Sequence, residues 1–438
     1  ITKNEEEQIM EEAIAHQIDD FLTKPVNPSQ ILMVVKKLTE KARINRDRIA
    51  REYLSQFNKI TAQINSGADW QDWIDIHTRL SNWEIELDRF PDLGLSEVLQ
   101  DQRNQCNLEF ARYIESNYVR WINGAKDRPP LSVDIATNFL ATPLKLGRKV
   151  LFLVIDCLRL DQYLAIESLL AELFNLRREF HYSILPTSTP YARNAIFSGL
   201  YPIELEKHFP DLWKRGEDDE SSSNRFEHQL LDQQLVKLSV GLRGDSKYVK
   251  ILDPEEAETV ERKVSSYFDQ PLVSMVFNFV DILAHARSNS DVIKEMVRNE
   301  ASFRAITRSW FEHSALYSIL RSYASQDILI VLTSDHGSIR CQRGTKVISD
   351  REASTNLRYK YGRNLKCDGK HVLFVKDPQE YKLPRRGINV NYILAREDYY
   401  FVYPTNFHKY ISLYKNSFQH GGISLEEMIL PIAVLEPR

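Results

Sequence analysis

The chain has 438 residues, a formal net charge of −4, and 43% hydrophobic and 27% charged residues. This composition is that of an ordinary globular protein of two or three domains, and it gives no overall electrostatic case for nucleic-acid or membrane binding. The cysteines have no paired spacing, so they indicate neither a disulfide framework nor a thiolate zinc site; they are Cys106, Cys157, Cys341 and Cys367. Without a signal peptide or a membrane-spanning run, we expect a cytoplasmic protein with no membrane insertion.

The N-terminal residues 1–45 have the pattern of a helix, a short strand and a second helix. Glu5 to Gln17 is helical in pattern, and Asp20 to Pro25 is a short strand. Asn27 and Pro28 then begin a helix that has no convincing stop before Ser66.

This segment resembles the last third of a response-regulator receiver domain, which has a flavodoxin-like fold. Thr2 matches the switch Thr/Ser of that family, and Lys24 matches the lysine of its Lys-Pro pair, a bond that is usually cis. The resemblance implies a cognate sensor histidine kinase as a partner. It also implies that the phosphoacceptor aspartate comes from an earlier segment that is not in this sequence.

Residues 46–127 have the pattern of a helical linker domain. Asp69 to Phe90 and Leu95 to Ile122 carry aromatic residues at helical spacing, and they follow the long helix from Pro28. The pattern predicts a small antiparallel three-helix bundle. We interpret its tryptophans as helix–helix core rather than as a ligand groove.

Residues 128–438 predict an α/β domain with a mostly parallel central sheet. Three apolar runs have the character of strands buried on both faces: Val150–Ile155, Val273–Phe279 and Ile328–Leu332. Met428–Leu435 is expected to be a further strand. Asp156, Asp281 and Asp335 come after the first three of these runs. Because sites in α/β sheets gather at the carboxyl ends of strands, we expect these carboxylates to lie close together.

A hydroxyl cluster heads another helix of this domain. An apolar run that we interpret as a strand, Tyr182 to Leu185, leads through a proline into Thr187, Ser188 and Thr189, and Gly199 closes the helix that follows. A helix N-terminus next to a strand end favours an anion. The same residues would equally serve as helix caps, so the residues alone leave all three hydroxyls open.

Histidines accompany the carboxylates and point to a metal centre. Three carboxylates in one cleft are costly unless cations neutralise them. Imidazole and carboxylate ligation without thiolate suits Zn²⁺, with Mn²⁺ second. The candidate ligands are enough for two metal ions: Asp156, Asp281, His285, Asp335, His336 and His420.

The order of these motifs resembles the PglZ domain of the alkaline phosphatase superfamily. That resemblance implies one zinc on Asp281, His285 and His420, and a second on Asp156, Asp335 and His336 together with the nucleophile. Its spacing to Gly199 selects Thr189 as the nucleophile. Arg193 falls where sulfatases carry an arginine, but no cysteine stands at 189, so sulfate ester hydrolysis is not expected.

The receiver segment, the helical linker and the PglZ domain in this order resemble the PorX-type response regulators of Bacteroidota. The resemblance implies a zinc phosphodiesterase acting on nucleotide linkages, including linear or cyclic oligonucleotides. It further implies a phosphorylation-dependent homodimer, a link to type IX secretion and gliding, and a sigma-factor or secretion-system partner. The alternative is a phosphorylation-switched scaffold whose metal domain is not catalytic.

The expected mechanism is in-line attack of Thr189 on phosphorus through a phosphothreonine intermediate. We expect the backbone N–H groups of the Pro190–Arg193 turn to balance the phosphate charge. Arg193 lies one helical turn past Thr189, where it would hold a phosphate oxygen or make a surface ion pair.

The sequence determines substrate choice less closely. Gly216 to Asn224 has the composition of a mobile loop. The basic and aromatic run Arg358 to Asn364 is consistent with base stacking, and equally with an ordinary strand and turn. It falls between the Asp-His-Gly and His-Gly motifs, where members of the superfamily insert substrate-selecting segments.

Overall fold

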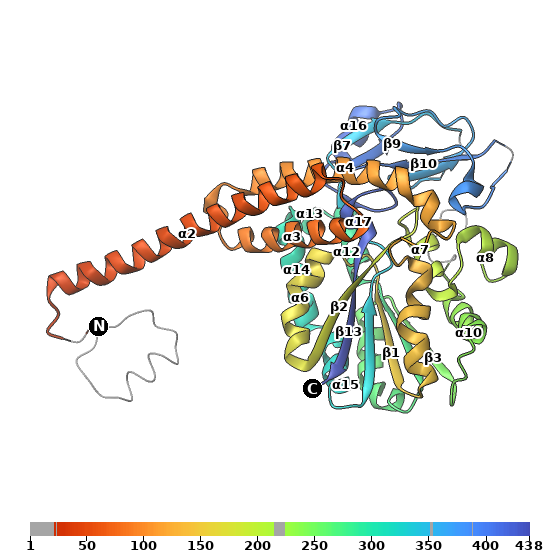
Figure 1. Ribbon diagram of the computed structural model, residues 1–438, viewed down its shortest axis with the longest axis horizontal. Coiled ribbons are helices and arrows are strands. Elements are labelled where there is room, and N and C mark those ends of the chain that lie inside the picture. The colour runs from red at the N-terminus through yellow and green to blue at the C-terminus, as the bar shows by residue number, and fades with distance from the viewer. Residues whose placement is uncertain (1–21, 23, 214–223, 351–353, 388) are drawn as a thin grey trace.

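A computed structural model describes residues 22, 24–213, 224–350, 354–387 and 389–438. Helices dominate the N-terminal part, and an α/β domain follows (Figure 1). Thr2 and the helix expected over Glu5 to Gln17 lie outside the described residues. Lys24 is described, and its bond to Pro25 is cis.

The N-terminal part consists of α2 (Pro28–Asn65), α3 (Trp70–Asp88) and α4 (Ser96–Ile122). The uninterrupted helix predicted from Pro28 is confirmed, and it passes straight through the expected domain boundary at residue 45. Its first turns project from the body of the molecule (Figure 1). Asp69 caps α3, because its side chain accepts from the amides of Gln71 and Asp72 at 2.8 and 2.9 Å.

Aromatic side chains form the core of this bundle, as predicted. The rings of Trp73 and Phe110 meet edge to face, with their centres 5.3 Å apart. Trp121 packs in the same way on Tyr182 at 5.6 Å, which joins the bundle to the α/β domain. Both tryptophans are buried, so they contribute to packing rather than to a ligand groove.

A six-stranded sheet lies at the centre of the α/β domain, in the order β2-β13-β5-β1-β4-β3. Its four parallel strands are β1 (Lys149–Ile155), β3 (Ser246–Ile251), β4 (Leu272–Phe277) and β5 (Ile328–Thr333). The strand β13 (Ile429–Pro437) runs antiparallel to β5 and to β2 (Phe174–Tyr182). The prediction of a mostly parallel sheet is therefore confirmed.

Both faces of the sheet are covered by helices. Along β1 the side chains of Val150, Phe152 and Val154 enter one core, and Leu151, Leu153 and Ile155 enter the other. This alternation explains why the strand is apolar throughout. On the first face lie α7 (Thr189–Ser198) and α10 (Glu227–Lys237); on the second lie α6 (Leu160–Leu173), α11 (Pro254–Lys263), α14 (Glu300–His313) and α15 (Ala315–Tyr323).

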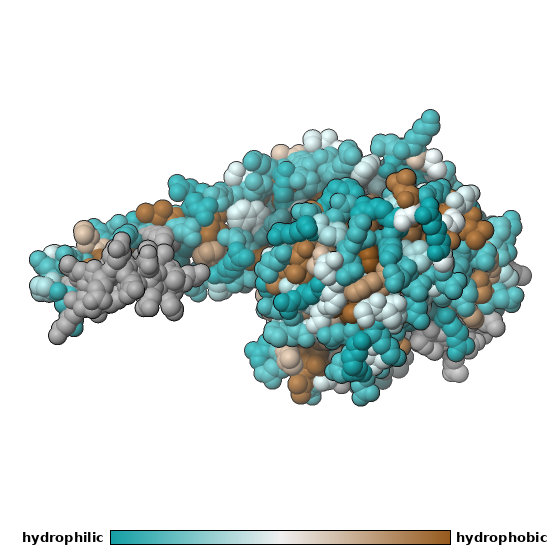
Figure 2. Space-filling view, turned by 90° about the horizontal axis from the view of Figure 1, so that it is seen from below, coloured by the Kyte–Doolittle hydropathy of each residue, from teal (hydrophilic) through white to brown (hydrophobic). Residues whose placement is uncertain are grey.

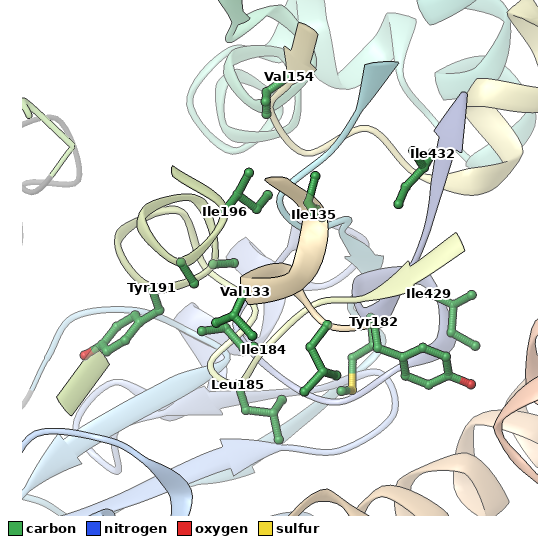
Figure 3. Close-up of a cluster of buried hydrophobic side chains, with 14 of the residues drawn as sticks. Val133, Ile135, Val154, Tyr182, Ile184, Leu185, Tyr191, Ile196, Ile429 and Ile432 are labelled. Atoms are coloured by element: carbon green, nitrogen blue, oxygen red, sulfur yellow. The ribbon is translucent and has the colours of Figure 1, made fainter. Parts of the chain in front are cut away.

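The first core reaches from the sheet to the hydroxyl cluster. Figure 3 shows Val154 of β1, Ile196 of α7 and Ile135 gathered on this face, with Ile184 and Leu185 beyond them. The segment before the hydroxyl cluster is therefore held by packing against residues from separate parts of the chain.

The strand expected over Tyr182 to Leu185 is wrong in its position, because β2 ends at Tyr182. The following amides leave the sheet: Ile184 N donates to Ser132 Oγ at 3.1 Å, and Leu185 N donates to Tyr118 Oη at 2.8 Å. Two side-chain hydroxyls, of which Tyr118 comes from the bundle helix α4, thus replace the next ladder bonds.

A smaller β-region follows β5, at the top of Figure 1. Its three-stranded sheet has the order β8 (Tyr359–Gly362), β10 (Asn391–Ala395) and β9 (Val372–Val375). Two strand pairs accompany this sheet: β7 (Arg343–Lys346) with β11 (Tyr399–Val402), and β6 (Ile339–Arg340) with β12 (Phe418–Gln419). The region also contains the helices α16 (Phe407–Tyr414) and α17 (Leu425–Met428). The run from Arg358 forms β8 and a turn, and the Arg358 guanidinium is buried against Glu427 at 2.6 Å, so Arg358 itself does not face a ligand.

The remaining helices are short connections or cover the sheet edges: α5 (Ala141–Lys145), α8 (Pro202–His208), α12 (Phe279–Asn289) and α13 (Asp291–Met296). Within the described ranges, no helix is both long and apolar enough to cross a membrane. The face in Figure 2 is largely hydrophilic, and its hydrophobic side chains form scattered patches.

Candidate metal centre and nucleophile

The first group of candidate ligands comprises Asp281, His285 and His420. Asp281 and His285 lie one turn apart on α12, directly after β4, while His420 lies between β12 and α17. Asp281 Oδ1 is 3.3 Å from His285 Nε2 and 3.6 Å from His420 Nε2. The two histidine Nε2 atoms are 3.1 Å apart, so all three side chains point at one position.

The second group comprises Asp156, Asp335 and His336. Asp156 follows β1 and the other two follow β5, the strand next to it in the sheet. His336 Nε2 is 3.6 Å from Asp156 Oδ1 and 3.8 Å from Asp335 Oδ2. In each group the potential ligand atoms lie within 4.8 Å of one another.

The two groups are neighbours. The rings of His336 and His420 stack with their centres 4.2 Å apart and their planes at 21°. Five of the six side chains are buried, and His285 is the more open one, with 42% of its side chain exposed. The structure thus brings the six candidate residues together, in the same two groups of three that the superfamily resemblance implies.

Backbone amides fix the orientation of Asp335. Its Oδ1 accepts from Cys157 N at 3.3 Å and from His336 N at 3.0 Å, which turns Oδ2 toward the second group. Cys157 has a φ of +64°, in the left-handed region that non-glycine residues rarely adopt. This turn after β1 is therefore held in a costly conformation directly beside Asp156.

Two glycines allow the motif loops to approach each other closely. A Cβ on Gly337 would lie 1.9 Å from the carbonyl oxygen of Glu426, and a Cβ on Gly422 would lie 2.3 Å from that of Ala395. Gly422 N also donates to Glu427 Oε1 at 2.9 Å. Gly337 of the Asp-His-Gly motif and Gly422, directly after the His-Gly motif, are thus required by packing around the ligands.

Among the three clustered hydroxyls, Thr189 lies at the second ligand group. It is the first residue of α7, and its Oγ1 is 2.9 Å from His336 Nε2. Thr187 has a different role, since its hydroxyl donates to Gly422 O at 2.8 Å and accepts from Gly421 N at 3.1 Å. Thr187 therefore holds the loop that carries His420.

The helix amides expected to face a phosphate are engaged within α7. Tyr191 N and Ala192 N donate to Ser188 O at 3.0 and 2.9 Å, and Pro190 has no N–H. The expectation that this turn balances phosphate charge is therefore wrong for these residues. Proline in the first helical turn is ordinary, because no hydrogen bond is lost there.

Arg193 makes a buried ion pair, so the alternative of a surface ion pair is wrong. Its Nε donates to Glu227 Oε1 at 2.6 Å and its Nη1 donates to Asp156 Oδ2. Glu227 also accepts from Asn224 Nδ2 at 2.6 Å and from the Tyr248 hydroxyl. The guanidinium thus lies between a candidate ligand and a carboxylate on α10.

Glu227 was missed by sequence reasoning. It is fully buried beside the second ligand group, yet it lies outside every motif that we singled out. Its neighbour Asn224 falls at the end of the stretch predicted as a mobile loop, although its amide is buried against Glu227. Only the fold brings this pair to the nucleophile helix.

The electrostatics of the centre suit divalent cations. Burial by itself raises the pKa of Asp281, but the adjacent His285 and His420 lower that pKa below its usual value. Burial, followed by the proximity of His336, holds the pKa of His420 well below its usual value, which favours the neutral ligand form. Asp335 Oδ2 is buried and has no hydrogen-bond partner among the described residues, so a bound cation would satisfy it.

Two family models match the chain. Residues 139–435 match the BREX system PglZ alkaline phosphatase-like domain, and residues 43–122 match the PorX response regulator linker domain. No curated protein matches the chain.

Solved structures that resemble this chain include murine ectonucleotide pyrophosphatase/phosphodiesterase 5. It is 14% identical, with a TM-score of 0.39 over 66% of this chain and 88% of its own. Phosphonoacetate hydrolase from Sinorhizobium meliloti 1021, in complex with phosphonoformate, is 13% identical, with a TM-score of 0.40 over 66% of this chain and 90% of its own.

Proposed function

Because the chain belongs to the PglZ family of alkaline phosphatase-like domains and carries a PorX response regulator linker, we propose that it is a response regulator whose output is metal-dependent phosphodiester hydrolysis. The observation that carries this proposal is the 2.9 Å contact between Thr189 Oγ1 and His336 Nε2. A hydroxyl at the first residue of a helix, against a cluster of candidate ligands, has the setting of an activated nucleophile.

Two zinc ions would be held by the two groups of ligands, Mn²⁺ being the alternative. Asp281, His285 and His420 would hold one ion, and Asp156, Asp335, His336 and the Thr189 oxygen would hold the other. Such ions, when bound, lower the pKa of a coordinated hydroxyl and neutralise charge on the reacting phosphate.

The residues of the chain would then divide the work of the reaction. Thr189 Oγ1 forms a bond to phosphorus while the bond to the leaving oxygen breaks in line with it, and water hydrolyses the resulting phosphothreonine. Arg193 would act as a positioning residue, since Glu227 holds it against Asp156. Its direct contact with a phosphate oxygen stays a prediction.

The substrate that we propose is a nucleotide phosphodiester, in a linear or cyclic oligonucleotide. The linker implies a two-component system, so a sensor histidine kinase would act through the receiver segment that includes Thr2 and Lys24. A phosphorylation-dependent homodimer, a sigma-factor or secretion-system partner, and a role in type IX secretion and gliding belong to the same proposal.

The proposal is tested by metal removal. Turnover of an aryl phosphodiester and of the matching aryl monoester is measured on zinc-loaded protein, after chelation, and after zinc is restored. We expect diester turnover to exceed monoester turnover, to disappear with chelation and to return with zinc. Diester turnover that survives complete metal removal contradicts the proposal, and a metal-loaded protein that hydrolyses neither ester nor any oligonucleotide supports a scaffold instead.

A further inference from the structure

Arg386 lies in an unusual setting close to the nucleophile helix. It belongs to the segment between Pro378–Tyr381 and β10. Its guanidinium carbon is 4.1 Å from the centre of the Tyr361 ring, and Nη1 donates to the Tyr361 hydroxyl at 2.9 Å. Nη2 donates to the hydroxyl of Tyr191 at 3.3 Å. Phenol groups thus surround this cation.

No carboxylate of the described residues pairs with Arg386, although it is half-buried, and its Nε has no hydrogen-bond partner among them. Its neighbour Arg385 pairs with Asp377 at 3.1 Å, and the buried Arg358 pairs with Glu427 at 2.6 Å. A guanidinium removed from water normally acquires an anionic partner. Arg386 therefore has both the charge and an unsatisfied donor for an anion that the described residues do not supply.

The Arg386 cluster adjoins the candidate metal centre. Tyr191 lies two residues beyond Thr189 in α7. Figure 3 shows the Tyr191 ring directed away from Ile196, and the ring is buried. On its other side this ring meets Tyr359 edge to face, at 5.7 Å and 86°.

Tyr359 in turn lies against the loop that carries His420. A Cβ on Gly421 would be only 2.5 Å from Tyr359 Cδ1, and Gly421 directly follows His420. Arg386 thus contacts the nucleophile helix through Tyr191, and Tyr359 lies between Tyr191 and the loop that carries His420. A single tyrosine, two residues after Thr189, therefore joins Arg386 to the helix that begins at the candidate nucleophile.

We infer that Arg386, stacked on Tyr361 and held by Tyr191, binds a second phosphate group of the substrate, other than the one attacked by Thr189. This inference rests on the proposed function and narrows it to nucleotide chains that carry at least one further phosphate. A guanidinium offers phosphate oxygens two parallel N–H donors, and its stacking on an aromatic ring pre-organises it for that contact.

The test compares two diesters on metal-loaded protein: bis(p-nitrophenyl) phosphate, which has a single phosphate, and a 5′-phosphorylated dinucleotide, which has a second. For Arg386→Gln we expect KM for the dinucleotide to rise roughly 10- to 100-fold, the size of one charge-assisted hydrogen bond, with kcat nearly unchanged. The aryl diester should be hydrolysed as by wild type. Arg386→Lys should recover part of the lost affinity, because lysine keeps the positive charge but lacks the two parallel N–H donors of the guanidinium.

Arg385→Gln is the matched control, because Arg385 is the adjacent arginine, is exposed and pairs with Asp377. It should change neither substrate. Equal loss of activity on both diesters in Arg386→Gln overturns the inference, because Arg386 would then support only the fold. Unchanged activity on both diesters also overturns it, because Arg386 would then make no contribution to substrate binding.

A binding measurement separates this inference from the proposed function. If wild type hydrolyses neither diester, the proposed function fails, and dinucleotide binding by calorimetry to metal-loaded wild type and to Arg386→Gln decides the second-phosphate site alone. A 10-fold or greater weakening in the variant supports the site, whereas equal affinities, or no binding to wild type, overturn it.

Discussion

Arg103 of the bundle helix α4 donates from Nη1 to Glu426 Oε1 at 2.9 Å, which ties the linker to the short helix that follows His420. Asn107, one turn further along α4, donates to Glu426 Oε2 at 3.0 Å and accepts from Leu425 N at 2.8 Å. These groups are all buried. The linker and a candidate metal-ligand loop are therefore connected by direct, desolvated hydrogen bonds.

Removing Arg103 should destabilise the protein strongly. Arg103→Met leaves the carboxylates of Glu84 and Glu426 buried without this cation, which costs roughly 3–5 kcal/mol in comparable buried pairs. Thermal or denaturant unfolding measures the loss. Arg112→Met on the same helix is the control, because Arg112 is largely exposed and pairs with Glu109, and it should change stability by less than about 0.5 kcal/mol. Equal effects of the two substitutions would contradict the role given to the buried pair.

His77 of α3 lies beside this network and should make stability depend on pH. Burial, and then the nearby Arg103, lower the pKa of His77 from 6.5 to about 3, and neither ring nitrogen has a hydrogen-bond partner among the described residues. As pH falls from 6.5 toward 3, the unfolded chain takes up a proton that the folded chain does not, so stability is lost over that range.

The expected size is about 1.4 kcal/mol of stability per pH unit between pH 6 and pH 4. Denaturant unfolding of wild type and His77→Leu across this range isolates the contribution, because all other titrating groups are shared. The slope of wild type should exceed that of the variant by this amount. Parallel slopes would mean that His77 is protonated or solvated in the folded protein.

Removing His285 should abolish one metal site without harming the fold, because 42% of its side chain is exposed. In His285→Ala we expect metal content to fall by about one equivalent and diester turnover to fall by roughly 100-fold or more, since one of two ions is lost. His313→Ala, an exposed histidine of α14, is the control for any general effect on metal analysis. Unchanged metal content in His285→Ala would remove this residue from the centre.

Glu227→Gln tests the buried carboxylate that holds Arg193. The substitution keeps the shape of the side chain but removes the charge that fixes the guanidinium against Asp156. We expect metal affinity to weaken by roughly 10- to 100-fold, as is typical when a group behind a ligand is changed. A metal titration followed by turnover at saturating metal measures this, and an unaltered titration would show that Arg193 orients Asp156 without Glu227.

The ligands could be predicted from the sequence because their positions follow from simple geometry. Asp156 and Asp335 come directly after two apolar runs, and adjacent parallel strands end at one edge of the sheet. Asp281 and His285 have the spacing of one helical turn, which places them on one face whatever the rest of the fold does. Thr189 needed the spacing of a known superfamily, because its own hydroxyl is no different from that of Thr187.

Contacts made across the fold could not be predicted. Glu227 of α10 contacts Arg193, and Arg386 of the β-region after the Asp-His-Gly motif contacts Tyr191. The partners in each pair are far apart in the sequence, so no sequence spacing indicates either contact. The amides of α7 were misjudged for a different reason. Their partner, Ser188 O, depends on where the helix begins, and helix ends are the least determined part of a sequence pattern.

The central claim is that the Thr189 hydroxyl attacks a phosphodiester at a two-metal centre. Its most direct measurement is turnover of bis(p-nitrophenyl) phosphate by wild type and Thr189→Ala, with the metal content of both proteins determined in the same samples. The account predicts that Thr189→Ala keeps two metal equivalents and loses turnover by roughly 1,000-fold or more, because the hydroxyl that forms the covalent intermediate is removed. Full metal-dependent turnover by Thr189→Ala would contradict it.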